Sequence, residues 1–324
     1  MDWERNCIRL CAGILVLSVT LRLAAAGVFA PVGRLMASPQ AVSFFLYLHT
    51  GRMVRTAPAE TPDAPEPTAP EPEQPVFPPE ELERVEVSRS CACNPDLEQL
   101  LTKPLDWSLT DPSGPTVLIL HTHGTEAYTS PGGADYEASG TYRTLDEDHN
   151  MLSLGQLVAR RLEEAGIGVI QDRNLHDYPD YNSAYANAGA SVQELLAEYP
   201  SIRLILDLHR DAADTAYGQM VTECSIGSER AAQLMIVVGT DAGGQPHPDW
   251  EENLSLALKL QVLLERENPG ICRPLKLTHH RYNQHLGDRA LLIEIGAAGN
   301  TLHEAELAAE ALARAVIGLQ HGSR

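Results

Sequence analysis

The stretch Val117-Leu-Ile-Leu-His-Thr-His-Gly-Thr-Glu126 joins four apolar residues to a group of polar ones. An apolar run of this length is typical of a strand that is buried on both faces of a parallel sheet. Histidine and glutamate pack poorly in such surroundings, so their position directly after the run indicates a functional role. The stretch therefore predicts a buried strand whose carboxyl end carries a site.

Strands and helices alternate along the chain after this stretch. The apolar pattern predicts strands at residues 168–171, 204–208, 235–239 and 291–295, and helices at residues 150–165, 185–199, 250–267 and 304–319. Thr301-Leu-His-Glu304 matches a capping box in front of the last helix. Alternation of this kind predicts an α/β fold, with a mostly parallel, twisted sheet that has helices on both faces.

Polar residues stand at or beside three of the predicted strand ends, at residues 121–126, residues 207–211 and Glu294. Ligands of such sheets bind at the carboxyl ends of the strands. We therefore expect these three distant parts of the sequence to meet at one edge of the sheet.

Four residues of the first two groups can supply the ligands of a catalytic zinc ion: His121, His123, Glu126 and His209. Catalytic zinc takes three protein ligands of these types and keeps a fourth position for water, whose pKa falls to about 7. Spacing alone allows either His121 or His123 to hold the metal.

Glu294 follows the apolar run Ala290-Leu-Leu-Ile293 and precedes another isoleucine. A carboxylate among aliphatic side chains is desolvated, which raises its pKa toward the range of a general base. We expect Glu294 to take a proton from the attacking water and to pass it to the leaving amine. Arg210 and the zinc ion would stabilise the tetrahedral oxyanion.

The charge of the chain argues against a nucleic-acid partner. Its formal net charge is −20, from 44 acidic and 24 basic residues, and no basic stripe interrupts it. Phosphate binding needs clustered Lys and Arg, which this sequence lacks. The sequence also contains neither a G-x-S-x-G nucleophile elbow nor a G-x-x-x-x-G-K-[ST] phosphate loop.

Composition divides the chain into three parts. Residues 1–55 are predicted to contain a membrane anchor, because residues 10–32 are apolar except for Arg22 and are long enough for the roughly 20 residues that span a bilayer. Ala24-Ala25-Ala26 would allow a cleaved signal peptide instead. Residues 56–114 are predicted to be a disordered Pro/Glu-rich linker, and residues 115–324 the catalytic domain. Cys91-Ala-Cys93 in the linker is interpreted as an incidental or disulfide-forming pair.

Six motifs of the C-terminal part resemble, in order, those of the stage II sporulation protein P family of cell-wall hydrolases. They are Ile119-Leu-His-Thr-His-Gly-Thr-Glu-Ala-Tyr128, Asp207-Leu-His-Arg-Asp-Ala212, Leu234-Met-Ile-Val-Val-Gly-Thr240, Trp250-Glu-Glu-Asn-Leu254, Arg281-Tyr-Asn-Gln284 and Leu291-Leu-Ile-Glu-Ile-Gly296. The resemblance covers residues 115–319. Two positions depart from the family pattern: Gly124 stands where Thr is common, and His285 where Asp is common.

The resemblance implies an amidase-like fold and a zinc-dependent N-acetylmuramoyl-L-alanine amidase that also cleaves peptide crosslinks of peptidoglycan during forespore engulfment. It implies a single-pass anchor in the cell membrane, with the catalytic domain outside the cytoplasm. It also implies two partners, a lytic transglycosylase and a multi-spanning membrane protein of the engulfment complex.

The resemblance also affects which residues are expected to bind the metal. Alignment with the amidases selects His123 for the metal, and it places the carboxylate ligand near Asp146 or Glu147, whereas we favour Glu126. Two other functions stay open on the sequence. One is a catalytically inert, wall-binding scaffold of the engulfment complex, and the other is an amidohydrolase-type metalloenzyme, which would need an eight-stranded barrel.

Overall fold

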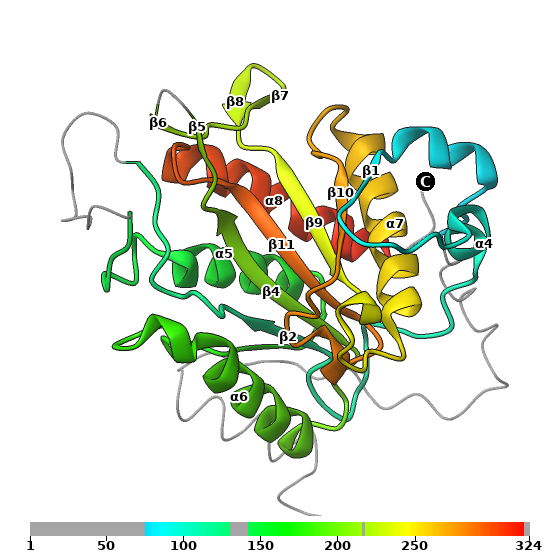
Figure 1. Cartoon of the computed structure of the whole chain (residues 1–324), viewed down its shortest axis with the longest axis horizontal. Coiled ribbons are helices and arrows are strands. Elements are labelled where there is room, and N and C mark those ends of the chain that lie inside the picture. Colours follow the sequence, from blue (N-terminus) through cyan, green and yellow to red (C-terminus); the bar gives the residue numbers. More distant parts are fainter. Residues whose placement is uncertain (1–74, 130–141, 216–217, 321–324) are drawn as a thin grey trace, which may run out of the picture. The chain divides into compact units, whose positions relative to one another are not determined.

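A seven-stranded sheet forms the centre of the residues that the computed structural model describes, 75–129, 142–215 and 218–320 (Figure 1). Its strand order is β1-β10-β9-β11-β4-β2-β3. The strands are β1 (Val87–Arg89), β2 (Val117–Leu120), β3 (Val169–Gln171), β4 (Leu204–Asp211), β9 (Leu234–Gly239), β10 (Leu275–Thr278) and β11 (Ala290–Ala297).

Two parallel blocks make up this sheet. Strands β11, β4, β2 and β3 pair in parallel, as do β9, β10 and β1, and the blocks meet where β11 pairs antiparallel with β9. The prediction of a mostly parallel sheet is confirmed. In the described part of the chain, β1 and β3 are the open edges of a seven-stranded mixed sheet, which is not the eight-stranded parallel barrel that an amidohydrolase-type enzyme needs.

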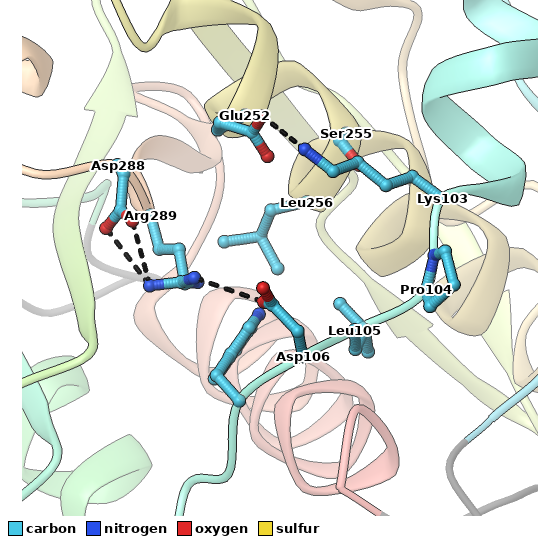
Figure 2. A pocket seen from close by; sticks show the side chains of 10 residues that line it. Lys103, Pro104, Leu105, Asp106, Glu252, Ser255, Leu256, Asp288 and Arg289 are labelled. Atoms are coloured by element: carbon cyan, nitrogen blue, oxygen red, sulfur yellow. Dashed lines mark hydrogen bonds and ion pairs between the residues drawn. The ribbon is translucent and has the colours of Figure 1, made fainter.

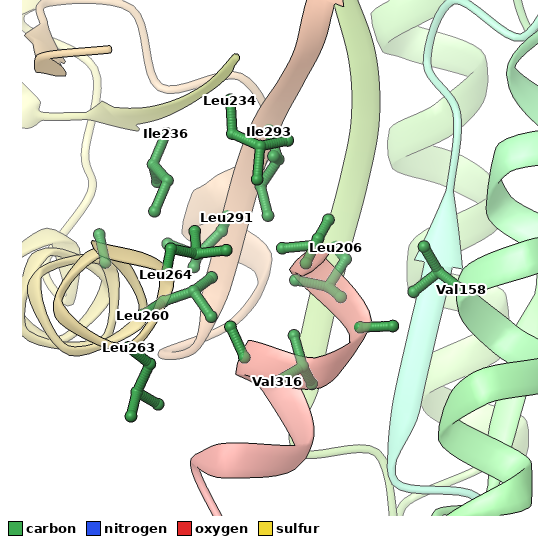
Figure 3. Close-up of a cluster of buried hydrophobic side chains, with 14 of the residues drawn as sticks. Val158, Leu206, Leu234, Ile236, Leu260, Leu263, Leu264, Leu291, Ile293 and Val316 are labelled. Atoms are coloured by element: carbon green, nitrogen blue, oxygen red, sulfur yellow. The ribbon is translucent and has the colours of Figure 1, made fainter. Parts of the chain in front are cut away.

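Helices cover both faces, as predicted (Figure 1). They are α4 (Leu97–Thr102), α5 (Met151–Glu164), α6 (Ala184–Glu198), α7 (Trp250–Glu267) and α8 (Leu302–Gly318). Helices α5, α7 and α8 share one buried cluster with alternate residues of the strands, such as Leu206, Leu291 and Ile293 (Figure 3). The residues between them, such as Ile205, pack on the other face against α6. Each fully buried Leu or Ile contributes about 1.5–3 kcal/mol to the free energy of folding.

The start of α8 confirms the predicted capping box. The Thr301 side chain accepts a hydrogen bond from the backbone N–H of Glu304, and the Glu304 side chain accepts one from the backbone N–H of Thr301. Two orphan donors of the first helical turn are satisfied in this way, which fixes where the helix begins.

The folded part begins earlier than composition predicted. Residues 75–114, assigned to the linker, form the 3-10 helix η1 (Pro79–Arg84), strand β1 and helix α4. Strand β1 pairs with β10, and α4 buries two leucines while the buried Lys259 of α7 donates to the carbonyl of Leu100. A three-residue strand and a six-residue helix carry too little periodicity to be recognised, so the linker boundary at residue 114 was wrong.

Several shorter elements complete the described part. They are the hairpins β5 (Asp214–Thr215)–β6 (Gly218–Gln219) and β7 (Cys224–Ile226)–β8 (Glu229–Ala231), and the 3-10 helices η2 (Tyr181–Ser183), η3 (Asp241–Gly243) and η4 (Gln284–Leu286). Cys91 and Cys93 form a disulfide. The predicted anchor lies outside the described residues, and none of the helices described here is long and apolar enough to cross a membrane.

Candidate active site

The three polar groups of the sequence meet at one edge of the sheet, as predicted. Strands β11, β4 and β2 are neighbours and run parallel, so their carboxyl ends lie side by side. Glu294 on β11 is the register partner of His209 on β4. Paired residues of neighbouring strands point to the same face, here the face that α6 covers in part.

His209 lies between two carboxylates. Its Nε2 is 3.0 Å from Oδ1 of Asp207, an ion-pair contact without the alignment of a hydrogen bond, and its Nδ1 is 3.7 Å from Oε2 of Glu126. Burial alone would lower the pKa of His209, but the negative charges of Asp207, Glu126 and Glu294 outweigh it and raise the pKa to about 9. The three carboxylates therefore stabilise a positive charge at the His209 ring.

His123 lies beside His209, with ring centroids 5.4 Å apart. Its ring stacks on Tyr181 at 4.5 Å and meets the edge of Tyr185 at 5.5 Å. Burial, together with the positive charges of His209 and Arg143, lowers the pKa of His123 to about 4. This imidazole is neutral at pH 7, which is the form that binds metals.

Glu126 projects into the same cluster from the turn after β2. Only 3% of its surface is exposed. The backbone N–H of Arg210 donates to its Oε2 at 3.2 Å, and Arg143 donates to its Oε1 at 3.2 Å. These two bonds hold the carboxylate against His209.

Glu294 has the environment expected of a general base. It is partly buried, and its Oε2 is closed off from solvent with no hydrogen-bond partner in the described part of the chain. Burial raises the pKa of Glu294 to about 8, with the attraction of His209 opposing the shift and the repulsion of Glu126 adding to it. A carboxyl group with this pKa can both accept and release a proton near neutral pH.

His121 lies on the other face of the sheet, under α5. Its Nδ1 is 3.3 Å from the carbonyl of Leu208, and its Nε2 is 3.1 Å from Nε2 of Gln171. A Cβ added to Gly155 of α5 would come within 2.3 Å of the ring, so this glycine makes room for it. Burial lowers the pKa of His121 to about 4. The structure thus does not bring His121 together with His123 and His209.

The structure also shows where the other two candidates for the carboxylate ligand lie. Asp146 is exposed and pairs with His149, and Glu147 is exposed and pairs with Arg173. Neither reaches the cluster in this arrangement. Glu126 is the carboxylate that lies within 4 Å of His209 from the first motif.

Arg210 lies on the opposite side of β4 from His209, because side chains alternate along a strand. Its guanidinium donates to the carbonyl of Ala127 through Nε and to the carbonyl of Tyr142 through Nη2, both at 3.0 Å. This buried arginine therefore holds the segment that carries Glu126.

Sequence reasoning missed two residues that support the cluster. Asp177, in the loop between β3 and α6, accepts hydrogen bonds from the backbone N–H and hydroxyl of Thr125, and Arg143 joins Asp177 to Glu126. A lone Asp or Arg in a loop is usually a solvated residue, so neither carries a signal in one sequence. The only available hint was the second threonine of the first motif, a residue that often hydrogen-bonds to an acidic partner.

The residue types at this site are ones that bind zinc. Two histidines and a glutamate form one of the ligand sets of catalytic zinc. Nδ1 of His123 and Oε2 of Glu294 are buried and have no hydrogen-bond partner within the described ranges, and unpaired buried atoms are typical of a place that takes a ligand. As the side chains lie, no group of three or more His, Cys, Asp or Glu residues in residues 75–129, 142–215 and 218–320 is close enough to hold a metal.

Comparison with known proteins identifies relatives. A model of the family described as Stage II sporulation protein P matches residues 58–317. Stage II sporulation protein P of Bacillus subtilis (strain 168) is 30% identical over 210 residues, which cover 61% of this chain and 49% of that protein. The chain therefore spans about half the length of this curated relative.

Two solved structures are similar to the chain in part. One is N-acetylmuramoyl-L-alanine amidase AmiC2 of Nostoc punctiforme, with a TM-score of 0.37, 13% identity, and coverage of 62% of this chain and 94% of that one. The other is the amidase Ami1 of Mycobacterium abscessus, with a TM-score of 0.38, 12% identity, and coverage of 64% and 99%. Similarities at these scores assign no function.

Proposed function

The chain belongs to the stage II sporulation protein P family, and we propose that it is a zinc-dependent peptidoglycan hydrolase. It cleaves the amide bond between N-acetylmuramic acid and L-alanine, and it also cleaves peptide crosslinks. One observation carries the proposal: His123, Glu126 and His209 converge from two strand ends beside Glu294, a carboxyl group whose pKa burial raises to about 8.

His123, Glu126 and His209 would hold the zinc ion in this proposal. When bound, zinc lowers the pKa of a water molecule to about 7 and polarises the carbonyl group of the substrate. The hydrogen bonds from Arg143 and from the backbone of Arg210 keep the Glu126 carboxylate in place for this task. The neutral imidazole of His123 offers a nitrogen lone pair at pH 7.

Glu294 moves the proton. Its carboxylate takes a proton from the attacking water, the hydroxyl group adds to the lactyl carbonyl carbon, and the same carboxyl group then protonates the departing amine of L-alanine. Oε2 of Glu294 has no hydrogen-bond partner among the described residues, and it is the atom that can accept this proton. General acid–base catalysis of this kind contributes about 10²–10⁴-fold to the rate.

The cellular setting is part of the same proposal. We propose that residues 1–55 anchor the chain in the cell membrane by a single span, with the catalytic domain outside the cytoplasm and facing the wall during engulfment. Its partners there would be a lytic transglycosylase and a multi-spanning membrane protein. The apolar run at residues 10–32 supports the anchor, and the family membership supports the setting.

Digestion of purified sacculi tests the reaction. The full chain, loaded with zinc, should release stem peptides with a free L-alanine amine and convert crosslinked dimers to monomers, both identified by mass. A chelator should abolish the release, and added zinc should restore it. Zinc-loaded chain that binds sacculi but yields neither product would refute the proposal and favour an inert wall-binding scaffold.

A further inference from the structure

Asp207 touches both histidine-bearing segments of the candidate site. It stands two residues before His209 on β4, so both side chains point to the same face of the sheet. Its Oδ1 is 3.0 Å from Nε2 of His209. The same carboxylate accepts the backbone N–H of Thr122 at 2.9 Å and the Thr122 hydroxyl at 2.6 Å. Thr122 is the residue directly before His123.

We propose that Asp207 is a positioning residue: it turns the His209 ring so that Nδ1 faces Glu126, and it fixes the turn that carries His123. The proposal rests on the proposed function, because it treats His209 as a metal ligand. Asp207 itself contacts neither substrate nor metal in this role.

The geometry restricts the His209 ring to one orientation. Its two nitrogens face different carboxylates, Nε2 toward Asp207 at 3.0 Å and Nδ1 toward Glu126 at 3.7 Å. A histidine that binds a metal through one nitrogen usually donates the other N–H to a carboxylate, which fixes its tautomer and makes it a stronger ligand. Asp207 is the carboxylate within 3.0 Å of Nε2, so we assign it this part, which leaves Nδ1 for the metal.

The bonds to Thr122 keep the Asp207 carboxylate from rotating. One oxygen takes the backbone N–H and the other takes the hydroxyl, so each oxygen has a fixed donor. Asp207 is 5% exposed and Thr122 is fully buried, which leaves no water to replace these bonds. The contact with His209 is therefore preset before any metal arrives.

Asp211 provides a matched control on the same strand. It stands two residues after His209, as Asp207 stands two before, and it pairs with Arg273 at 2.8 Å. Replacement of either aspartate by asparagine removes one negative charge at nearly the same distance along β4. Only Asp207→Asn removes a carboxylate that contacts the His209 ring.

Zinc affinity of the full chain, measured by competition with a chromophoric chelator, tests the proposal. We expect Asp207→Asn to weaken zinc binding about 10–100-fold, the range for loss of a carboxylate behind a ligand histidine, and Asp211→Asn to change it less than about 3-fold. Equal affinity of Asp207→Asn and the unaltered chain would overturn the positioning role. If the unaltered chain binds no zinc, the proposed function fails instead.

A second measurement needs no folded variant at Asp207. In the zinc-loaded chain labelled with ¹⁵N-histidine, His209 should carry its proton on Nε2 and bind metal through Nδ1, with His209→Gln identifying its signals. A spectrum with the proton on Nδ1 and the metal on Nε2 would overturn the proposal, whether or not Asp207→Asn folds.

Discussion

Charged side chains at the two ends of strand β11 lie in different surroundings. Near its carboxyl end, Glu294 is partly buried, and its Oε2 has no hydrogen-bond partner among the described residues. At its amino end, Lys103, Glu252, Asp106, Asp288 and Arg289 line a pocket, and every one of these charged residues takes part in an ion pair (Figure 2). Both ends belong to the same sheet, so the difference comes from the local surroundings and not from the fold.

The contrast distinguishes charged groups in exposed ion pairs from a desolvated carboxyl group that can transfer a proton. Exposed ion pairs are stabilised by water as well as by each other, so each contributes little to the free energy of folding. A desolvated carboxyl group has less water to stabilise its ionised form, so its pKa rises toward neutral pH. A sheet end with desolvated, unpaired groups is therefore the better candidate for catalysis.

The strongest test of the comparison replaces one glutamate at each end. Glu294→Gln keeps the size of the side chain but cannot accept a proton, so release of stem peptides from sacculi should fall about 10²–10⁴-fold. Glu252→Gln, at the pocket, should leave the rate within about 2-fold, because its partner Lys103 is solvent-exposed. Equal rates for the two variants would remove Glu294 from the mechanism.

The pH dependence of stability tests the same carboxyl group in the metal-free chain. Between pH 4.5 and about 8, Glu294 is protonated in the folded protein and ionised in the unfolded one. The folded protein therefore binds one proton more than the unfolded protein. As a result, the free energy of unfolding should fall by about 1.4 kcal/mol per pH unit across this window, relative to Glu294→Gln. Below pH 4.5 this contribution is complete, and above about 8 it is lost. Parallel unfolding curves for the two proteins from pH 5 to 8 would show that the carboxyl group is not desolvated.

A third prediction separates the two histidines of the first motif, which lie on opposite faces of the sheet. His123→Gln should weaken zinc binding by more than about 100-fold, because loss of a metal ligand costs more affinity than loss of a carboxylate that only positions a ligand. His121→Gln should change zinc affinity less than about 3-fold, because His121 bonds to the carbonyl of Leu208 under α5, where a glutamine amide can also donate. The reverse result, measured by chelator competition, would move the metal to the other face.

Much of the fold follows from the sequence because apolar periodicity is local. The strand at Val117–Leu120 and the helix at Trp250–Glu267 agree with their predicted bounds, since a continuous apolar run and a helical apolar period are recognised without any distant partner. Strand β10 and residues 75–114 escaped prediction, because their short elements form only where the rest of the sheet offers an edge. The antiparallel pairing of β9 with β11 likewise depends on tertiary contacts.

The residue types of the candidate site could be predicted from the sequence, but the faces of the sheet to which their side chains point could not. Strand alternation places His121 on the same face as Ile119, but the chain turns at Thr122, so alternation says nothing of His123. The turn is held by Asp207, which lies 85 residues away in sequence. A contact of that kind leaves no trace in a single sequence, which is why the choice between the two histidines stayed open there.

The smallest effect is expected at the pocket itself. Lys103 and Glu252 are both more than 40% exposed on their side chains, and exposed ion pairs contribute about 0–1 kcal/mol. The double variant Lys103→Gln/Glu252→Gln should therefore lower the free energy of unfolding by less than about 1 kcal/mol, and its release of stem peptides should match that of the unaltered chain. Chemical denaturation at low and high salt measures the first quantity, and added salt should reduce the difference further, because it screens exposed charges. A loss of several kcal/mol, or a slower release of stem peptides, would mean that the two ends of β11 are coupled and that the division into stabilising and reactive charge does not hold.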